Sequence, residues 1–260
     1  MALDESEIEA FADRLYGAYA DKEPVAPLSD DAEITTEEAY AIQSRVFERL
    51  CPDRDSIVGH KLGLVSEAKQ EQLGIPEPIF CHVAPETVLE NEPVPTDDMI
   101  APRIEAEIGL LLGEDVAPDA TATDVLAATR AVVPVVEILE SRYQGWGIPS
   151  AQDVIADLTS AGKVIVGETL RDVTDVDLAM ESVVVSVNGE VEATGVGADI
   201  QGHPARPVAW LAGRLADFDD GLRAGELVMT GGINAAIDIE PGDVYNVRFG
   251  EIGSIEVRAE

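Results

Sequence analysis

Two glutamates separated by one residue occur in the segment Pro102–Leu110, which reads PRIEAEIGL. Side chains alternate between the two faces of a β-strand, so Glu105 and Glu107 would point to the same side. Two like charges on one face of a buried strand repel each other. A hard divalent cation removes this repulsion, because Mg²⁺ and Mn²⁺ prefer oxygen ligands. The spacing therefore predicts a metal site on a strand.

A third glutamate, Glu137, lies in the valine-rich segment Val135–Leu139. A carboxylate among apolar neighbours is costly unless it is paired or bound to a metal, so Glu137 is a candidate third ligand. The alternative is that the first two glutamates line a solvated face and Glu137 meets Arg103 or Arg142. The chain has 51 acidic residues, so a Glu-x-Glu pattern alone does not decide between the two.

Lys61 is one of four lysines and lies in the apolar, glycine-containing segment Gly59–Leu64. Burial or neighbouring cations would lower the pKa of such an amine toward the range of a general acid or base. The alternative is a surface lysine with a buried stem. A glycine loop after a predicted strand, Thr230–Asn234, is a second candidate. Its backbone N–H groups could hold a substrate carboxylate, and it lacks the spacing of a nucleotide-binding loop.

The elements that would position these residues fall into two groups. Residues 4–20 have helical spacing, and Thr35 with Glu38 forms a capping box that opens a helix through about Leu50. Residues 1–55 are therefore predicted as a helical cap, and residues 56–260 as a β-rich core, the fold class being α+β. Helices are predicted at 122–130 and 204–216, and strands at 104–112, 132–139, 163–167, 183–187, 190–194, 227–230, 244–249 and 252–257. Asn188-Gly189 suits a type I′ hairpin turn.

Composition excludes several classes of protein. The net charge of −34 repels nucleic acid and anionic membranes, which bind through Lys and Arg. No apolar run approaches the roughly 20 residues of a membrane span, and the acidic N-terminus lacks an apolar signal region. We therefore expect a cytoplasmic protein with two reduced, packed thiols, Cys51 and Cys81. An acidic, lysine-poor surface also predicts a halophilic source.

The sequence resembles the family of 4-oxalocrotonate decarboxylase and 2-keto-4-pentenoate hydratase, which shares the fumarylacetoacetate hydrolase fold. The resemblance covers nearly the whole chain. It implies a β-rich core with a rolled, mixed sheet, preceded by a helical N-terminal region. It also implies a homo-oligomer, possibly with a related hydratase or decarboxylase subunit. The segments that carry it are 39–43, 58–64, 102–108, 135–138, 140–143, 188–190, 202–204, 229–232 and 241–243.

This resemblance implies roles for particular residues. The metal ligands would be Glu105, Glu107 and Glu137, and Lys61 an active-site lysine. Further catalytic and substrate-binding candidates are Asp157, Ser160, Ser66, Thr230, Gly231 and Gly232. Ser66 has a second interpretation as the N-cap of the helix that follows, through Gln72. Similar proteins usually read Ala-Asp-Asn-Ala-Ser at 156–160, but this chain has Leu158 for the asparagine. We expect any substrate hydrogen bond from that amide to be lost.

Three classes of function follow. The first is a metal-dependent lyase acting on an unsaturated 2-oxo acid, and Pro78-Ile79-Phe80 favours a decarboxylase over a hydratase. Glu77 is evidence against that choice, because it could handle water as a hydratase acid does. The second class is an acylpyruvate hydrolase, which needs a water-activating base. None of the three histidines, His60, His82 and His203, is predicted in an evident dyad with a carboxylate. The third class is an acidic binding protein without catalysis.

Overall fold

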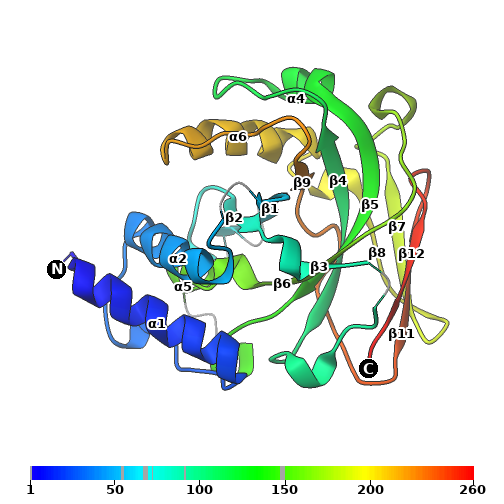
Figure 1. Cartoon of the computed structure of the whole chain (residues 1–260). Coiled ribbons are helices and arrows are strands. Elements are labelled where there is room, and N and C mark those ends of the chain that lie inside the picture. Colours follow the sequence, from blue (N-terminus) through cyan, green and yellow to red (C-terminus); the bar gives the residue numbers. More distant parts are fainter. Residues whose placement is uncertain (1, 54–55, 67–69, 72, 91, 147–149) are drawn as a thin grey trace.

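The computed structural model describes residues 2–53, 56–66, 70–71, 73–90, 92–146 and 150–260. Two helices form its N-terminal region, α1 (Glu5–Asp21) and α2 (Thr36–Leu50), which pack side by side (Figure 1). Both begin at a capping box, in which the cap side chain and the third helical residue satisfy each other's backbone N–H groups. In α2 this box pairs Thr35 with Glu38, as predicted.

The larger sheet curls around the centre of the molecule (Figure 1). Within the described residues it has eight strands, in the order β2-β1-β9-β4-β5-β6-β3, and β10 pairs with β4. It is mixed, because β1 runs parallel to β9 and β3 parallel to β6, whereas the other pairs are antiparallel. The strands are β1 (Gly59–Gly63), β2 (Ile79–Val83), β3 (Val88–Leu89), β4 (Arg103–Leu112), β5 (Thr129–Leu139), β6 (Ala161–Val166), β9 (Leu227–Met229) and β10 (Ile237–Asp238).

The predicted fold class is confirmed by this curled, mixed sheet and the helices that precede it. Strands β1 and β2 were not among the predicted strands. Glycine at both ends of β1 weakens the sequence signal, since glycine is depleted in strands. At Gly59 a side chain could not fit, because its Cβ would lie 1.8 Å from the carbonyl oxygen of Leu227 on the parallel neighbour β9.

The smaller sheet has four strands among the described residues, in the order β12-β11-β7-β8. It packs beside the long strands of the larger sheet (Figure 1). The predicted hairpin is confirmed: Asn188 and Gly189 join β7 to β8 with φ angles of 51° and 91°. Both are positive, as a type I′ turn requires. The strands are β7 (Ser182–Val187), β8 (Glu190–Val196), β11 (Val244–Phe249) and β12 (Ser254–Arg258).

Most buried apolar side chains of the N-terminal helices and of the sheets belong to one core, and a smaller cluster lies among β2, β5, β6 and β9. The division of the chain at residue 55 stays a prediction. Three further α-helices lie among the described residues, α4 (Ala122–Ala128), α5 (Ala151–Ala156) and α6 (Ala205–Ala216). Of these, α5 packs against α2 and α4 against α6. Among the described residues, every helix is too short or too polar to cross a membrane.

Candidate active site

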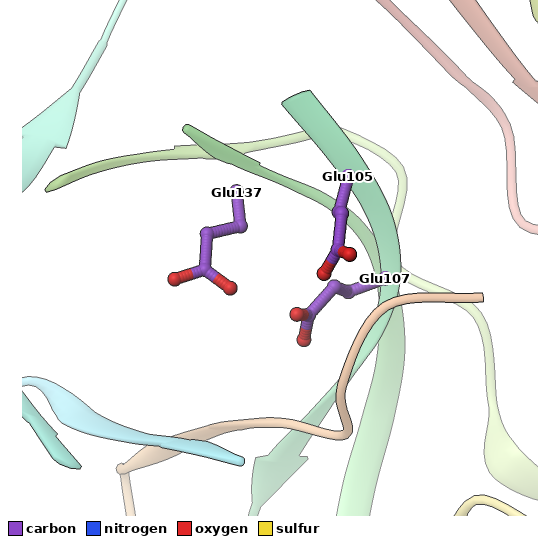
Figure 2. A group of neighbouring side chains, drawn as sticks. All are labelled: Glu105, Glu107 and Glu137. Carbon is purple, nitrogen blue, oxygen red and sulfur yellow. The ribbon is translucent and has the colours of Figure 1, made fainter. Parts of the chain in front are cut away.

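The three predicted metal ligands converge on one point at the inner face of the larger sheet. Glu105 and Glu107 lie on β4, and Glu137 lies on β5 directly opposite Glu105 in the antiparallel register. One carboxylate oxygen from each lies within 4.8 Å of the other two. Figure 2 shows the three carboxylates pointing into the same space. Strand alternation and the β4–β5 register together make this arrangement.

All three carboxylates are removed from water, with relative exposures of 7%, 0% and 1% for Glu105, Glu107 and Glu137. Burial raises the pKa of Glu107 well above its ordinary value, and the charge of Glu137 raises it further. Burial also raises the pKa of Glu137, although Lys61 opposes that shift. Glu107 Oε1 is buried and has no hydrogen-bond partner among the described residues. A hard cation fits this set of oxygen donors, because it would bind the orphaned oxygen and offset the like charges.

The glycine loop after β9 runs along β4 and positions the glutamates. The backbone N–H of Gly231 donates to Glu107 Oε2 at 2.8 Å. Gly232 leaves room for Glu105, because a Cβ there would lie 2.1 Å from Glu105 Oε2. Thr230 hydrogen-bonds through both its backbone N–H and its hydroxyl to the carbonyl of Ile108. The Gly231 N–H therefore binds the carboxylate of Glu107, a candidate metal ligand, where the sequence predicted a substrate carboxylate.

Lys61 lies on β1 and reaches the same space from the opposite side. Its side chain is 2% exposed, and Nζ forms an ion pair with Glu137 Oε1. Nζ also donates to the backbone oxygen of Thr159 at 2.7 Å. The alternative of a surface lysine is therefore wrong. So is the alternative that Glu137 meets Arg103 or Arg142, because the cation at Glu137 is Lys61.

A cavity of about 440 Å³ opens beside these groups. Its polar lining includes Lys61, Glu105, Glu137 and Gly232, and most of its other described walls are apolar. Of the remaining predicted site residues, Ser66 and Ser160 also line it. Sequence reasoning did not select Arg103, Trp146 and Thr159, which line it as well. Strand alternation could have found Arg103, since it lies two residues before Glu105 on the same face of β4.

Comparison with known proteins identifies the family. A family model described as "Fumarylacetoacetate (FAA) hydrolase C-terminal" matches residues 57–259. The chain belongs to this family. It is 36% identical over 259 residues to a 4-oxalocrotonate decarboxylase of Pseudomonas putida, with 98% of each chain covered. It is 35% identical over 255 residues to a 2-keto-4-pentenoate hydratase of Paraburkholderia xenovorans, covering 97% of this chain and 94% of that protein.

A solved structure agrees with both the predicted family and the predicted fold. The 4-oxalocrotonate decarboxylase of Pseudomonas putida G7, complexed with magnesium and adipate, superposes with a TM-score of 0.95 at 34% identity. The match covers 100% of this chain and 99% of that one. The resemblance to the decarboxylase and hydratase family of the fumarylacetoacetate hydrolase fold is thereby confirmed.

In this family member, three consecutive non-glycine residues next to Lys61 adopt left-handed backbone angles. Leu158, Thr159 and Ser160 have φ values of 52°, 53° and 57°. The left-handed conformation costs roughly 1–2 kcal/mol per residue with a side chain. Buried contacts hold it: Gln43 of α2 donates to the carbonyls of Phe80 and Ile155 and to Thr159 Oγ1. This left-handed turn presents the Thr159 carbonyl to Lys61.

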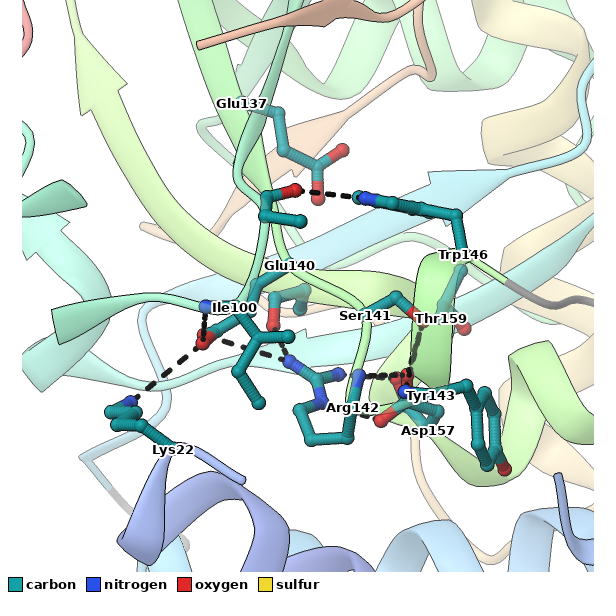
Figure 3. Close-up of polar contacts among 12 residues, drawn as sticks. Lys22, Ile100, Glu137, Glu140, Ser141, Arg142, Tyr143, Trp146, Asp157 and Thr159 are labelled. Atoms are coloured by element: carbon teal, nitrogen blue, oxygen red, sulfur yellow. Dashed lines mark hydrogen bonds and ion pairs between the residues drawn. The ribbon is translucent and has the colours of Figure 1, made fainter. Parts of the chain in front are cut away.

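Asp157, predicted as a catalytic residue, takes part in a buried ion pair and is not on the described wall of the cavity. Its carboxylate pairs with Arg142 (Figure 3). Arg142 also donates to the backbone oxygens of Asp157 and Ala161, at 2.5 and 2.6 Å. Glu140 lies beside the same guanidinium, at 3.8 Å. Asp157 and Arg142 thus flank the left-handed turn together, and a catalytic role for Asp157 stays a prediction.

The expected loss of a substrate hydrogen bond at Leu158 stays a prediction, and the structure shows where this side chain lies. The Leu158 side chain is buried, and it lines a small cavity of about 50 Å³ with Tyr19 and Phe47 of the N-terminal helices. It is not among the described residues of the cavity beside the glutamates. A side chain at this position therefore faces the core. The N-cap interpretation of Ser66 involves residues 67–69 and 72, which lie outside the described residues.

The expectation of no histidine–carboxylate pair was wrong. His60 Nε2 lies 3.3 Å from Glu226 Oε2, and His60 Nδ1 lies 3.2 Å from His82 Nδ1. This pair occupies the other face of β1, because His60 precedes Lys61 and side chains alternate. His60 borders a separate cavity of about 760 Å³. The pair is therefore directed away from the glutamates. His203 accepts a hydrogen bond from the backbone N–H of Ala205, at the start of α6.

Proposed function

We propose that this protein is a metal-dependent lyase that decarboxylates 2-oxo-3-hexenedioate to 2-hydroxypenta-2,4-dienoate in aromatic meta-cleavage catabolism. The observation that carries the proposal is the buried cluster of Glu105, Glu107 and Glu137, joined to Lys61 at the edge of a largely apolar cavity. Relatives named as decarboxylases and as hydratases support a lyase of this family. A decarboxylase structure with magnesium supports Mg²⁺, with Mn²⁺ as an alternative of the same chemistry.

The three glutamates would hold the cation, with a charge of −3 against its +2. As three ligands of an octahedral ion, they would leave about three of six positions for other ligands. Bound there, the cation would accept the C1 carboxylate and C2 oxygen of the 2-oxo acid and stabilise negative charge on that oxygen. Loss of CO₂ from C6 leaves an electron pair that moves through the C3–C4 double bond toward the C2 oxygen. We assign to Lys61 Nζ the proton transfer to that oxygen, which completes the dienol.

The cavity lining favours decarboxylation over hydration. Ile79 lines it, whereas Glu77, the acid that could have handled water, is not among its described walls. An apolar environment favours loss of a carboxylate as neutral CO₂. 2-Keto-4-pentenoate hydratase remains the second candidate, because relatives of both kinds match the chain equally well. An acylpyruvate hydrolase is less well supported, since the pair of His60 and Glu226 faces away from the glutamates.

The deciding experiment supplies 2-oxo-3-hexenedioate and 2-hydroxypenta-2,4-dienoate separately, each with Mg²⁺ in high KCl. CO₂ release from the first compound is the expected result. Hydration of the second compound, without CO₂ from the first, would replace the decarboxylase with the hydratase.

Metal dependence is tested independently of the reaction. We expect EDTA to abolish turnover and Mg²⁺ or Mn²⁺ to restore it. Glu105→Gln, Glu107→Gln and Glu137→Gln should each weaken Mn²⁺ binding strongly, because each removes a full ligand charge. Mn²⁺ titrations followed by electron paramagnetic resonance measure this, with Glu190→Gln on the exposed edge as a matched control. Parental affinity in all three variants would refute the site.

The remaining proposals concern the setting of the enzyme. The substrate is a small-molecule 2-oxo acid, and the protein works in the cytoplasm as a homo-oligomer, possibly with a related hydratase or decarboxylase subunit. Its net charge of −34 supports a halophilic source. Thermal melting in KCl tests this last point. Equal stability at about 0.1 M and at multimolar salt would end the halophile hypothesis.

A further inference from the structure

Arg103 extends the row of metal ligands along β4. Residues 103, 105 and 107 share one face of the strand, so the row carries one cation followed by two carboxylates. Two residues of a strand span about 7 Å. Arg103 lines the same cavity as Glu105, and its side chain is 32% exposed. It therefore lies toward the mouth of the cavity, roughly one six-carbon chain from the glutamates.

Among the described residues, two contacts hold the Arg103 guanidinium, and neither of them is a hydrogen bond from its two terminal nitrogens. Nε donates to Asp238 Oδ1 at 2.6 Å, and the guanidinium carbon lies 4.3 Å from the centre of the Trp146 ring. Trp146 is itself fixed by a hydrogen bond of 2.8 Å from Nε1 to the carbonyl of Ala101. These contacts use Nε and one face of the guanidinium. The two terminal nitrogens can still bind a carboxylate in the planar, bidentate geometry that arginine favours.

Lys61 is the other cation in the described lining of the cavity, and it cannot bind a second carboxylate of a bound acid. Lys61 is buried, and its Nζ is engaged by Glu137 and by the Thr159 carbonyl. Most of the remaining described lining is apolar, including Leu64, Leu139 and Val154. A second negative charge on a bound acid would therefore meet apolar side chains, the hydroxyl residues Ser66, Thr159 and Ser160, or Arg103, and Arg103 is the cation among these.

We propose that Arg103 recognises the distal carboxylate of a dicarboxylic 2-oxo acid whose other end is bound at the glutamates. The inference deepens the proposed function and rests on it for the 2-oxo acid class. The ion pair exists in the bound substrate and must break when that carboxylate leaves as CO₂. Arg103 is thus a specificity residue that lowers KM without raising kcat, because the contact weakens in the transition state, where the apolar lining favours the departing neutral CO₂.

The test is equilibrium binding of two acids that are not turned over, 2-oxoadipate and 2-oxohexanoate, to the Mg²⁺-loaded protein by calorimetry. The parent should prefer the diacid. Arg103→Met should weaken diacid binding roughly 10- to 100-fold and leave the monoacid unchanged. Arg103→Lys, which keeps the charge without the fork, should give an intermediate preference. Arg258→Met, which changes an exposed arginine on β12, is the matched control and should retain the parental preference.

Three outcomes would overturn the inference: equal weakening of both acids in Arg103→Met, an unchanged preference, or no diacid preference in the parent. A thermal melt of each variant separates loss of folding from loss of binding, and Arg103→Lys supplies the test if Arg103→Met does not fold. With 2-oxo-3-hexenedioate, Arg103→Met should raise KM and leave kcat undiminished. The binding measurement does not depend on which reaction is catalysed, so failure of the decarboxylase proposal alone would leave the diacid preference intact.

Discussion

Two turns of this protein place residues with side chains in the left-handed region, and they differ in what keeps them there. In the hairpin turn, Asn188 and Gly189 are exposed, and both are residue types that adopt this conformation readily. Asn188 also exchanges hydrogen bonds with Asp243 and Val244 across the neighbouring strands. The residue types of the hairpin turn therefore favour its conformation, and the contacts with the distant strand act in the same direction.

In the left-handed turn at 158–160, by contrast, the residue types oppose the backbone conformation. Leu, Thr and Ser disfavour positive φ, and all three residues are buried. Gln43 from α2 donates to Thr159 Oγ1, and Arg142 from the segment after β5 donates to the backbone oxygens of Asp157 and Ala161, which flank the turn. Backbone strain of this kind persists only where the surroundings over-determine it, and such places are often functional. Here the turn delivers the Thr159 carbonyl to Lys61, so tertiary contacts maintain a geometry that the local sequence opposes.

The largest expected effect is a loss of kcat on changing Lys61, which donates a hydrogen bond to the left-handed turn. Lys61→Ala should retain Mn²⁺ binding and lose about 10²- to 10⁴-fold in kcat, because a positioned proton donor is removed. Arginine should not rescue it, since a guanidinium does not release a proton near neutral pH. Lys163→Ala on β6 is the control, assayed in parallel. Full activity in Lys61→Ala would show that neither Lys61 nor the left-handed turn contributes to catalysis.

Breaking the ion pair beneath the left-handed turn comes next. Arg142→Met leaves the carboxylate of Asp157 buried without its partner, which should lower the free energy of unfolding by about 3–5 kcal/mol. Urea denaturation measures this loss. The double variant Arg142→Met with Asp157→Asn should recover part of it, because the uncompensated charge is gone. A loss below about 1 kcal/mol in the single variant would show that Arg142 does not hold the turn.

The contact from the N-terminal helices should have a smaller effect. Gln43→Leu removes the amide that binds Phe80, Ile155 and Thr159, so we expect a loss of roughly 1–3 kcal/mol in unfolding free energy. Since the turn then holds Lys61 less firmly, kcat should fall while Mn²⁺ affinity stays unchanged. Gln152→Leu on α5 is the comparison variant. If kcat is unaffected by Gln43→Leu, the N-terminal helices contribute stability alone.

The smallest effect should be at the hairpin. Gly189→Ala forces a side chain into a residue with a φ of 91°, at a site with no neighbouring atom within 4 Å of the added Cβ. The expected loss is about 1 kcal/mol of stability, from backbone strain alone. The kinetic constants for 2-oxo-3-hexenedioate should equal those of the parent. A change in kcat would contradict the separation between the two turns.

The sequence by itself determined the features that depend on neighbours along the chain. The capping box of Thr35 and Glu38, the Asn188-Gly189 turn and the shared face of Glu105 and Glu107 all follow from local periodicity and turn chemistry. The resemblance added the rolled-sheet fold and favoured Glu137 as a candidate ligand over its alternative, an ion pair with an arginine. Strand β1 escaped prediction, because its glycine at position 59 is explained only by the close approach of β9.

Tertiary structure decided how these local features meet. The register of β4 and β5 places Glu137 opposite Glu105, and the order of strands in the sheet brings Lys61 to Glu137. The ion pair of Asp157 with Arg142 also depends on packing, so the sequence did not predict it. The direction of Leu158 depends on a left-handed backbone that its own residue type disfavours. Pairings across long sequence separations are fixed by the packing of the whole core, and a single sequence carries no local signal for them.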